Sequence, residues 1–422
     1  MIIINEDFYE LNGDFNYHYF GENIYVSTPQ TIFNLNSLYS SVLSLINENI
    51  SIESIYKYIC NDYKLDEKDN EVIQAFNNII TELNTKNIIK IKNNNKYFNN
   101  ILFTGKKHKY YPKLILIELT NQCNFTCPHC YKEANNKKNI FIDENRLYQF
   151  FSKLDNKVEH IELSGGEATL HPNINNIIRH LKKYTKHISL LTNGSNISKL
   201  DDDVLKILSD IQITLYGYNS NSYYNFTNNK TSYDDVIKGL DIIEKKHVPI
   251  IVAIMLNKQN FSFIDKYIDI IKNYTLKDLR FGMAMPFGRA LSEDFKGKYN
   301  LSKEDINYVN NELEKYINNS YNKIETHHIR YSTLLRTENE YSLKCGAGKN
   351  IIIIGQDCMI RPCNMLPEDL FKVCSIEEYF DIINKGFIYD FSQNIYDFEK
   401  KLITLNLTLE DIKCTGFCDI EV

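Results

Sequence analysis

The sequence has no hydrophobic run long enough to cross a bilayer and no cluster of basic residues. A membrane-spanning helix needs about 20 consecutive apolar residues, and no stretch of the chain approaches that length. The formal net charge is −6, and no basic stretch favours nucleic acid or an anionic membrane surface. The first residues, M-I-I-I-N-E-D, lack a cationic lead, so we expect no signal peptide. We therefore expect a cytoplasmic protein with neither a nucleic-acid nor a membrane partner.

The cysteines are unevenly distributed along the chain. The 422 residues include 10 cysteines, and these are bunched rather than scattered. Such bunching is typical of metal ligands in a reducing compartment rather than of disulfides. Apolar residues make up 43% and charged residues 24% of the chain, which is an ordinary globular composition. The length allows two or three domains.

The central motif is the stretch Leu114–Tyr131, which reads L-I-L-I-E-L-T-N-Q-C-N-F-T-C-P-H-C-Y. Its cysteines, Cys123, Cys127 and Cys130, have the spacing C-x₃-C-x₂-C on one short loop. Thiolates at these offsets can bind three irons of a cubane cluster and leave the fourth iron without a protein ligand. A zinc site or a set of buried thiols is the alternative. Zinc usually takes four ligands, and His129, between two of the cysteines, is poorly placed to be the fourth.

This motif resembles the signature of the radical S-adenosylmethionine (SAM) enzymes, in which the open iron chelates the amino and carboxylate groups of SAM. The resemblance implies a 4Fe-4S cluster on these cysteines, SAM as its partner, and an electron donor such as flavodoxin or ferredoxin. It also implies that reductive cleavage of SAM yields a 5′-deoxyadenosyl radical, which removes hydrogen from an unactivated carbon of the substrate.

Residues 1–100 are predicted to form a separate winged-helix-like α+β unit. Aromatic and polar residues alternate in Phe15–Val26 around Gly21-Glu22-Asn23, which predicts a hairpin. Ile88–Ile91 is a candidate closing strand, and the polar, breaker-rich segment Lys92–Pro112 is predicted to be a linker. Helical spacing of apolar residues occurs in three segments between them, Leu35–Leu45, Ser51–Tyr63 (with Ser51 as N-cap) and Asp69–Leu83.

The predicted helices of this unit carry no lysine or arginine cluster that would mark a DNA-recognition helix. The unit resembles instead the peptide-recognition domain of ribosomal-peptide-modifying enzymes, similar to the small accessory protein of pyrroloquinoline quinone biosynthesis. That resemblance implies that a leader peptide binds as an added strand beside the hairpin. A structural cap on the next domain is the alternative. Cys60 lies on an apolar helix face and is expected to belong to the core.

Residues 112–300 show a repeating strand–helix pattern. Apolar strands that alternate with helices predict parallel β-structure, and six units predict a partial (β/α)6 barrel in an α/β fold. The candidate strands are Lys113–Leu119, His160–Ser164, His187–Thr192, Ile211–Leu215, Ile250–Leu256 and Leu279–Ala284. The candidate helices are Asp143–Leu154, Asn173–Tyr184, Asp201–Leu208, Tyr233–Lys246 and Phe263–Tyr274. Active sites of such sheets lie at the carboxyl ends of the strands, and the cysteine loop follows the first strand.

A Gly-Gly-Glu sequence follows the second candidate strand, at Gly165, Gly166 and Glu167. Two glycines allow the backbone to approach a ligand closely and to expose its amide and carbonyl groups. The resemblance to radical SAM enzymes implies that these three residues hold the amino group of SAM.

Polar side chains at other strand ends are further candidates for the SAM site. Thr192 and Asn193 end the third strand and are candidates to hydrogen-bond the ribose or carboxylate of SAM. Gln212 and Thr214 share one face of the fourth strand because side chains alternate along a strand. Ordinary hydrogen bonding at strand ends is the alternative for all four. Tyr131 either packs near the adenine or belongs to the core.

The sixth strand runs into Pro286-Phe287-Gly288-Arg289-Ala290, a sequence that also occurs in peptide-modifying members of the family. Two roles are open for Arg289. It either meets a carboxylate or caps the barrel.

Residues 301–422 are predicted to contain a bridging helix, Leu301–Asn319, and a small auxiliary-cluster domain. The segment from Cys345 to Asn364 and the late cysteines resemble the extension called SPASM, or its shorter relative, Twitch. Cys358 stands where the family usually has glycine and is an alternative ligand, whereas Cys374 is expected to be packing. Two fully thiolate-ligated cubanes would need about eight cysteines, so one auxiliary iron–sulfur cluster is expected. The resemblance implies the ligands Cys345, Cys363, Cys414 and Cys418; a Cys₄ zinc site is the alternative.

Together the segments resemble a radical SAM peptide maturase that acts on a ribosomally made precursor peptide. A thioether crosslink is the expected product, as in sactipeptides and ranthipeptides. A carbon–carbon crosslink or Cα epimerisation is the alternative within the same chemistry. A non-catalytic, zinc-binding peptide adaptor is the alternative from a different class.

Overall fold

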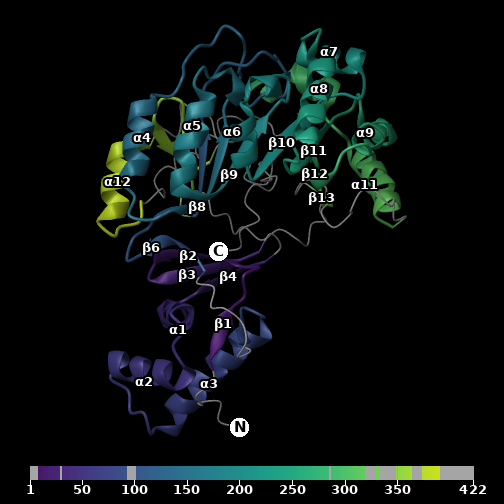
Figure 1. Ribbon diagram of the computed structural model, residues 1–422. Helices are drawn as coiled ribbons and strands as arrows, with labels where there is room; N and C mark the ends of the chain where they lie inside the picture. The colour runs from purple at the N-terminus through teal and green to yellow at the C-terminus, as the bar shows by residue number, and fades with distance from the viewer. Residues whose placement is uncertain are drawn as a thin grey trace. The chain divides into compact units, whose positions relative to one another are not determined.

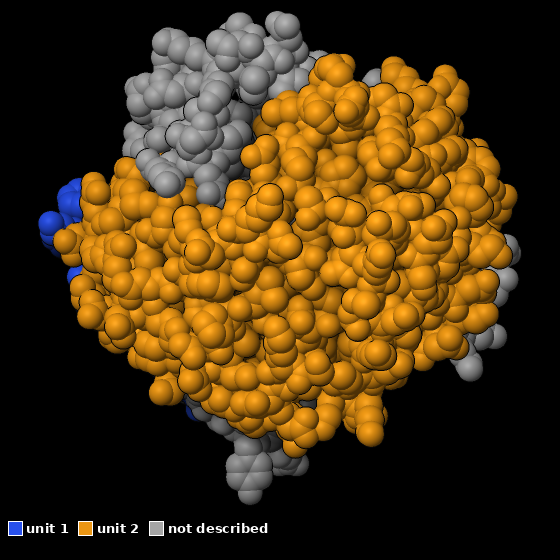
Figure 2. Space-filling model, turned by 90° about the horizontal axis from the view of Figure 1, so that it is seen from above, with its two compact units in different colours: residues 1–113, 383–387, 420–422 blue, residues 114–382, 388–419 orange. Residues whose placement is uncertain are grey.

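The structure is a computed structural model that describes residues 8–28, 31–92, 101–284, 287–318, 329–331, 348, 350–363 and 373–389 (Figure 1). The chain divides into two compact units (Figure 2). The first unit ends at Lys113 and also takes in residues 383–387, and the second begins at Leu114. Within the described ranges, no helix is both long and apolar enough for a transmembrane span.

The described residues of the first unit form two small sheets and three helices. Its elements are β1 (Tyr9–Leu11), β2 (Asn16–Gly21), β3 (Asn23–Ser27), β4 (Ile32–Leu35), α1 (Ser37–Asn47), α2 (Ile52–Tyr63), α3 (Asn70–Thr85), β5 (Ile89–Ile91) and β6 (Phe103–Lys107). The larger sheet has the order β4-β3-β2-β6, and β1 pairs with β5. The predicted hairpin is confirmed, because β2 and β3 pair antiparallel and Gly21 takes the positive φ of +63° at their turn.

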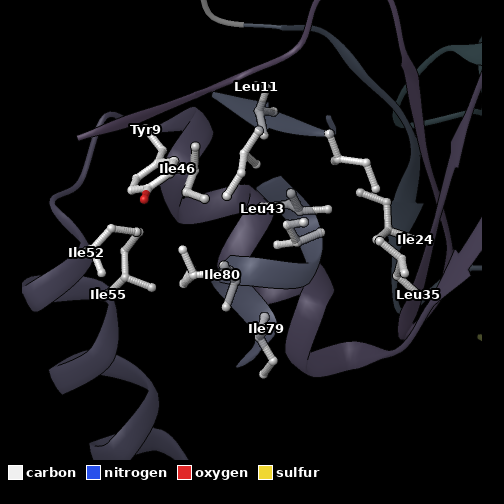
Figure 3. Packing of buried hydrophobic residues seen from close by; sticks show 14 of the residues in the cluster. Tyr9, Leu11, Ile24, Leu35, Leu43, Ile46, Ile52, Ile55, Ile79 and Ile80 are labelled. Atoms are coloured by element: carbon white, nitrogen blue, oxygen red, sulfur yellow. The ribbon is translucent and has the colours of Figure 1, made fainter. Parts of the chain in front are cut away.

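The three predicted helices of this unit are also confirmed. Ser51 caps α2 as expected, because its side chain accepts a hydrogen bond from the amide of Ser54. The apolar faces of α1, α2 and α3 meet the strands in one core, part of which is drawn in Figure 3. Cys60 is buried in this core. Helix periodicity was a sufficient signal here because each helix has a single apolar face.

The prediction of a featureless linker at Lys92–Pro112 is wrong in part. Residues Phe103–Lys107 form β6, which pairs in parallel with β2. The sequence F-T-G-K-K has neither clear alternation nor a run of β-branched residues, so it carries no strand signal of its own. The pairing is decided by the open edge of β2 and by buried His18, whose ring nitrogens hydrogen-bond Thr104 Oγ1 and the Tyr111 carbonyl.

The second unit is an α/β structure built on one ten-stranded sheet. Its strands are β7 (Leu114–Glu118), β8 (Val158–Ser164), β9 (Thr185–Thr192), β10 (Asp210–Leu215), β11 (Ile250–Leu256), β12 (Leu276–Met283), β13 (Ile329–Tyr331), β14 (Ile351–Ile354), β15 (Met359–Arg361) and β16 (Cys374–Ser375). Its helices are α4 (Glu144–Ser152), α5 (Ile174–Leu181), α6 (Asp202–Ile207), α7 (Ser220–Thr227), α8 (Ser232–Lys245), α9 (Ile264–Ile271), α10 (Glu293–Tyr299), α11 (Lys303–Asn318) and α12 (Ile376–Asn384).

All six predicted strands of the second unit are present as β7–β12, parallel and in sequential order. The five predicted helices between them are also present, and α4, α5 and α6 lie side by side along the sheet (Figure 1). The sheet is wider than predicted, because β13 pairs with β12 and β14 pairs with β7, followed by β15 and β16.

The two faces of this sheet differ in polarity. Residues such as Ile161 and Leu163 of β8 belong to the apolar, fully buried face. The alternate residues form a polar face, which includes Glu162 of β8, Gln212 of β10 and Arg280 of β12. Because ligands of parallel sheets bind at the carboxyl ends of the strands, we look for the site where this polar face meets those ends.

Candidate functional site

The cysteine loop follows β7 directly, as predicted. Cys123 and Cys127 are buried, and Cys130 is half-buried. The loop rests on the end of α7, where the amide of Thr126 donates to the carbonyl of Thr227 at 2.8 Å. Helix α7 was not predicted, because its sequence S-N-S-Y-Y-N-F-T has little apolar periodicity.

The Gly-Gly-Glu turn packs against the cysteine loop backbone to backbone. The amide of Gly166 donates to Thr120 O at 2.7 Å, and the amide of Glu167 donates to Gln122 O at 2.8 Å. A Cβ on Gly165 would meet Thr120 O at 2.6 Å, and one on Gly166 would meet Gln122 O at 2.3 Å. Our expectation that this turn exposes its amides to a ligand is therefore wrong for these two groups. The glycines are needed here for close approach to the cysteine loop.

The Glu167 carboxylate is buried and joins the ends of β8 and β9. Its Oε1 accepts hydrogen bonds from the amide and hydroxyl of Thr169, at 3.0 and 2.5 Å, and from the hydroxyl of Thr192 at 2.6 Å. Its Oε2 accepts from the amide of Asn193 at 2.7 Å. The carboxylate also lies close enough to Cys123 to raise the pKa of that thiol. The structure therefore brings together Glu167, Thr192 and Asn193 at the cysteine loop.

Asn193 makes the direct link between the end of β9 and the loop. Its side-chain amide donates to Asn124 Oδ1 at 2.9 Å and lies 4.0 Å from Cys123 Sγ. Asn124 in turn donates to Ser195 Oγ at 2.9 Å. Sequence reasoning missed Asn124, although its place beside a candidate ligand in a polar loop was a usable signal.

Gln212 and Thr214 share the polar face of β10, as the period of two predicted. Gln212 Oε1 accepts from Nη1 of Arg280 at 2.7 Å, and Arg280 Nε donates to Asp278 Oδ2 at 2.8 Å. Burial raises the pKa of Glu162, on the same face, to about 7, although Arg280 opposes the shift. Sequence reasoning missed Arg280. Its position between the apolar Leu279 and Phe281 was a usable signal, because side chains alternate along a strand and Arg280 therefore lies on the polar face of β12.

Arg289 lies over the cysteine loop. Its Nε donates to Cys127 O at 2.8 Å and its Nη1 to Ala134 O at 3.0 Å, while its amide donates to Cys130 O at 3.2 Å. These contacts are all with backbone carbonyls of the loop, so the two roles considered for Arg289, a carboxylate partner and a barrel cap, stay predictions. Tyr131 is half-buried, and its carbonyl packs against Gly288.

His129, which we expected to be poorly placed as a fourth ligand, packs against two aromatic rings. Its ring lies 5.2 Å from that of Phe226 and 5.3 Å from that of Tyr216, measured between centroids. Burial, with a smaller effect of Arg289, lowers the pKa of His129 to about 3. The histidine is therefore neutral and packs in an aromatic cluster.

The three loop thiols lie close enough to influence one another. Burial, with a smaller effect of the neighbouring cysteines, raises the pKa of Cys123 to about 12 and holds that of Cys127 well above its ordinary value. In the described part of the chain, no group of three or more His, Cys, Asp or Glu residues is arranged as a ready-made metal site. Metal binding would displace the protons of these thiols.

The structure describes only part of the predicted auxiliary site. Cys345, Cys414 and Cys418 lie outside the described residues. Cys363 is half-buried and follows β15. Cys358 is buried beside α4, with its thiol 4.0 Å from Asp143 O, and burial raises its pKa. Cys374 is buried in β16, in keeping with the packing role predicted for it.

A buried charge network ties the end of β7 to the cysteine loop and to the β14–β15 hairpin. Glu118 forms ion pairs with Lys132, just after the loop, and with Arg361 of β15, whose Nη1 lies 3.7 Å from Glu118 Oε2. The side chains of Lys132, Glu118 and Arg361 are 3%, 1% and 1% exposed. Arg361 also pairs with Asp357 at 2.9 Å. Gly355 is required beside it, because a Cβ there would meet Arg361 Nη1 at 1.5 Å.

Comparison with known proteins identifies the central part of the chain. Residues 117–271 match the family model described as the radical SAM superfamily. The chain contains a radical SAM domain. This family implies a 4Fe-4S cluster and SAM, in keeping with the cysteine loop and the Gly-Gly-Glu turn that the model range includes.

Two relatives of this radical SAM chain come from Bacillus subtilis (strain 168). The antilisterial bacteriocin subtilosin biosynthesis protein AlbA is 24% identical over 334 residues, which cover 77% of this chain and 71% of AlbA. The sporulation killing factor maturation protein SkfB is 24% identical over 196 residues, or 46% of this chain and 47% of SkfB. Both are thus named for the biosynthesis or maturation of a bacteriocin or killing factor.

Solved structures share the fold. Streptococcus suis SuiB bound to S-adenosylmethionine matches with a TM-score of 0.61 and 15% identity, covering 88% of this chain and 87% of SuiB. SuiB bound to the precursor peptide SuiA matches with a TM-score of 0.59 and 15% identity, covering 98% and 100%. The α/β radical SAM fold is therefore established, with its mostly parallel sheet.

Proposed function

We propose that this protein is a radical SAM maturase that modifies a ribosomally made precursor peptide. The observation that carries the proposal is the interlocked cysteine loop and Gly-Gly-Glu turn inside the matched radical SAM domain. The relation to AlbA over 77% of the chain supports a peptide as the substrate. A thioether crosslink is the product we favour, and a carbon–carbon crosslink or an epimerised Cα is the alternative.

Cys123, Cys127 and Cys130 would hold the cluster, since three soft thiolates on one loop match iron, and the ring of the neighbouring His129 packs against Phe226 and Tyr216. When bound, the cluster with SAM supplies one-electron reduction that leads to hydrogen abstraction from a carbon atom of the peptide. Glu167 orients the strand ends: its four accepted hydrogen bonds fix Thr192 and Asn193 beside Cys123. In our proposal these residues, with Gly165 and Gly166, form the SAM site.

The polar face of the sheet forms the remaining wall of the proposed SAM site. Gln212 and Thr214 are assigned to SAM, and Tyr131 to the neighbourhood of the adenine. Arg280 holds Gln212 by its side-chain oxygen, which leaves the Gln212 amide group to donate. Cys363, with Cys345, Cys414 and Cys418, is assigned to one auxiliary iron–sulfur cluster.

We assign leader binding to the first unit, at the edge of β4 rather than beside the hairpin. Both hairpin strands already have partners on both sides, because β6 pairs with β2 and β4 pairs with β3. In the described part of this unit, β4 and β6 are the edges of the larger sheet. The edge strand β6 carries Lys106, Lys107 and Gly105 with φ +68°, features that discourage strand addition. β4 reads I-F-N-L, with no charge, and can accept a peptide strand.

Anaerobic reconstitution of the full chain with iron and sulfide tests the cluster assignment. We expect about four irons for each cubane bound, and reductive cleavage of SAM to 5′-deoxyadenosine. Cys127→Ala should abolish that cleavage, whereas Cys60→Ala, which removes a core cysteine in the first unit, should not. A chain that binds zinc, binds no SAM and releases no 5′-deoxyadenosine would be an adaptor instead.

Mass spectrometry of a precursor peptide after incubation with the reconstituted full chain tests the product. A thioether predicts the loss of two hydrogen atoms and of one alkylatable cysteine thiol. Loss of hydrogen with all thiols still alkylatable indicates a carbon–carbon crosslink, and an unchanged mass with an inverted residue indicates epimerisation. Proline substitutions at Phe33 and Asn34 test the leader site. Along an edge strand, successive amides face alternately the neighbouring strand and the open edge. One of the two prolines therefore removes an amide that faces the open edge, and this proline should weaken leader binding without lowering the Tm.

A further inference from the structure

The Gly288-Arg289 pair after β12 gathers three carbonyls of the cysteine loop. Arg289 donates to Cys127 O and Ala134 O through its side chain and to Cys130 O through its amide. Gly288 has φ +54°, and a Cβ there would meet Tyr131 O at 2.5 Å and Cys130 O at 2.6 Å. These two residues therefore fix the segment that carries the second and third cysteines.

The third nitrogen of the guanidinium, Nη2, takes no part in these bonds. Nη2 of Arg289 is buried and has no hydrogen-bond partner among the described residues. A buried, charged N–H without an acceptor is costly and correspondingly rare in native proteins. Nε and Nη1 of the same rigid group are already bonded to carbonyls of the cysteine loop, so Nη2 lies close to that loop. The acceptor missing here is therefore expected to be anionic and to lie at the cysteine loop.

We propose that Arg289 is a positioning residue for the iron–sulfur group: it clamps the cysteine loop through three carbonyls and donates an N–H of Nη2 to a sulfur atom of the bound group. The inference rests on the proposed function for the presence of that group. Thiolates and sulfides of an iron–sulfur cluster are anionic acceptors, and hydrogen bonds to them stabilise the reduced cluster. The expected consequence is a raised reduction potential of the SAM-binding cluster.

Two measurements on the full chain test the two halves of the proposal, with Arg289→Gln, Arg289→Lys and the control Arg179→Gln. Arg179, on α5, also makes side-chain hydrogen bonds, but with the exposed carboxylates of Asp201 and Asp203 at the start of α6. In the metal-free protein, amide hydrogen exchange over residues 123–134 should be at least about tenfold faster in Arg289→Gln. The control should leave that exchange unchanged.

In the reconstituted protein without SAM, the midpoint potential followed by EPR should become more negative in Arg289→Gln. It should shift less in Arg289→Lys, which keeps the charge but lacks the planar fork. Unchanged exchange would overturn the clamp, and an unchanged potential at full iron content would overturn the sulfur contact. Weaker SAM binding with an unchanged potential would assign Nη2 to the SAM carboxylate instead.

Arg289→Gln and Arg289→Lys could both fail to take up iron. That result would support the clamp if amide exchange over residues 123–134 is faster, and it would contradict the clamp if this exchange is unchanged. A wild-type chain that takes up no iron would refute the proposed function. The exchange measurement would still decide the clamp, because it uses the metal-free protein.

Discussion

The buried ion pairs of Glu118 allow a quantitative prediction for Glu118→Gln. This substitution keeps the size of the side chain but leaves the cations of Lys132 and Arg361 buried with less compensation. Breaking a buried ion pair by removing one partner costs about 3–5 kcal/mol, because the remaining charge stays desolvated. At about 2–4 °C per kcal/mol for a domain of this class, the Tm should fall by roughly 6–20 °C. Thermal unfolding followed by circular dichroism measures the change.

A double variant separates charge from shape. Glu118→Gln combined with Lys132→Met removes both members of the pair and leaves Arg361 with Asp357, 2.9 Å away. We expect the double variant to regain at least half of the lost Tm, since no uncompensated lysine remains. Asp202→Asn, in an exposed pair with Lys246, should leave the Tm unchanged. A loss of less than about 1 kcal/mol in Glu118→Gln, or no recovery in the double variant, would refute the reasoning.

Three further predictions concern the strand ends. Gly166→Ala should destabilise the chain by about 1–3 kcal/mol, because the new Cβ meets a backbone carbonyl of the cysteine loop at 2.3 Å. Gly297→Ala is the control and should not destabilise the chain, because the space around Gly297 is open. Urea unfolding measures both variants, and equal effects would contradict the packing. Thr192→Val should lower the free energy of unfolding by about 1.5–3 kcal/mol in the same assay, since it removes a hydrogen-bond donor to the buried Glu167 carboxylate. An unchanged free energy of unfolding would mean that this bond is dispensable. Burial raises the folded-state pKa of Glu162 from 4.5 to about 7, so the contribution of the protonated side chain to stability is present at low pH and is lost as pH rises through this range. The Tm of Glu162→Gln relative to that of the wild type should therefore rise between pH 5 and pH 8. A difference in Tm that stays constant with pH would contradict the shift.

The local elements of this protein were largely predictable from its sequence. Strands β7–β12 are short apolar runs between amphipathic helices, and the period of two placed Gln212 and Thr214 on one face. The elements that were missed have weak local signals. α7 is rich in Asn, Ser and Tyr, and β6 has the sequence F-T-G-K-K. The structure of each is decided by the residues it packs against rather than by its own pattern.

The sequence alone determined which residues carry the chemistry, because spacing is a local property: a C-x₃-C-x₂-C loop after a strand and a Gly-Gly-Glu turn after the next. Only the tertiary structure decided how these motifs meet. The amides of Gly166 and Glu167 bond the cysteine loop instead of a ligand, and Arg289, far along the chain, holds that loop by its carbonyls. The physical reason is that hydrogen bonds between distant backbone groups depend on how strands stack side by side, and no pattern within a single segment encodes that arrangement.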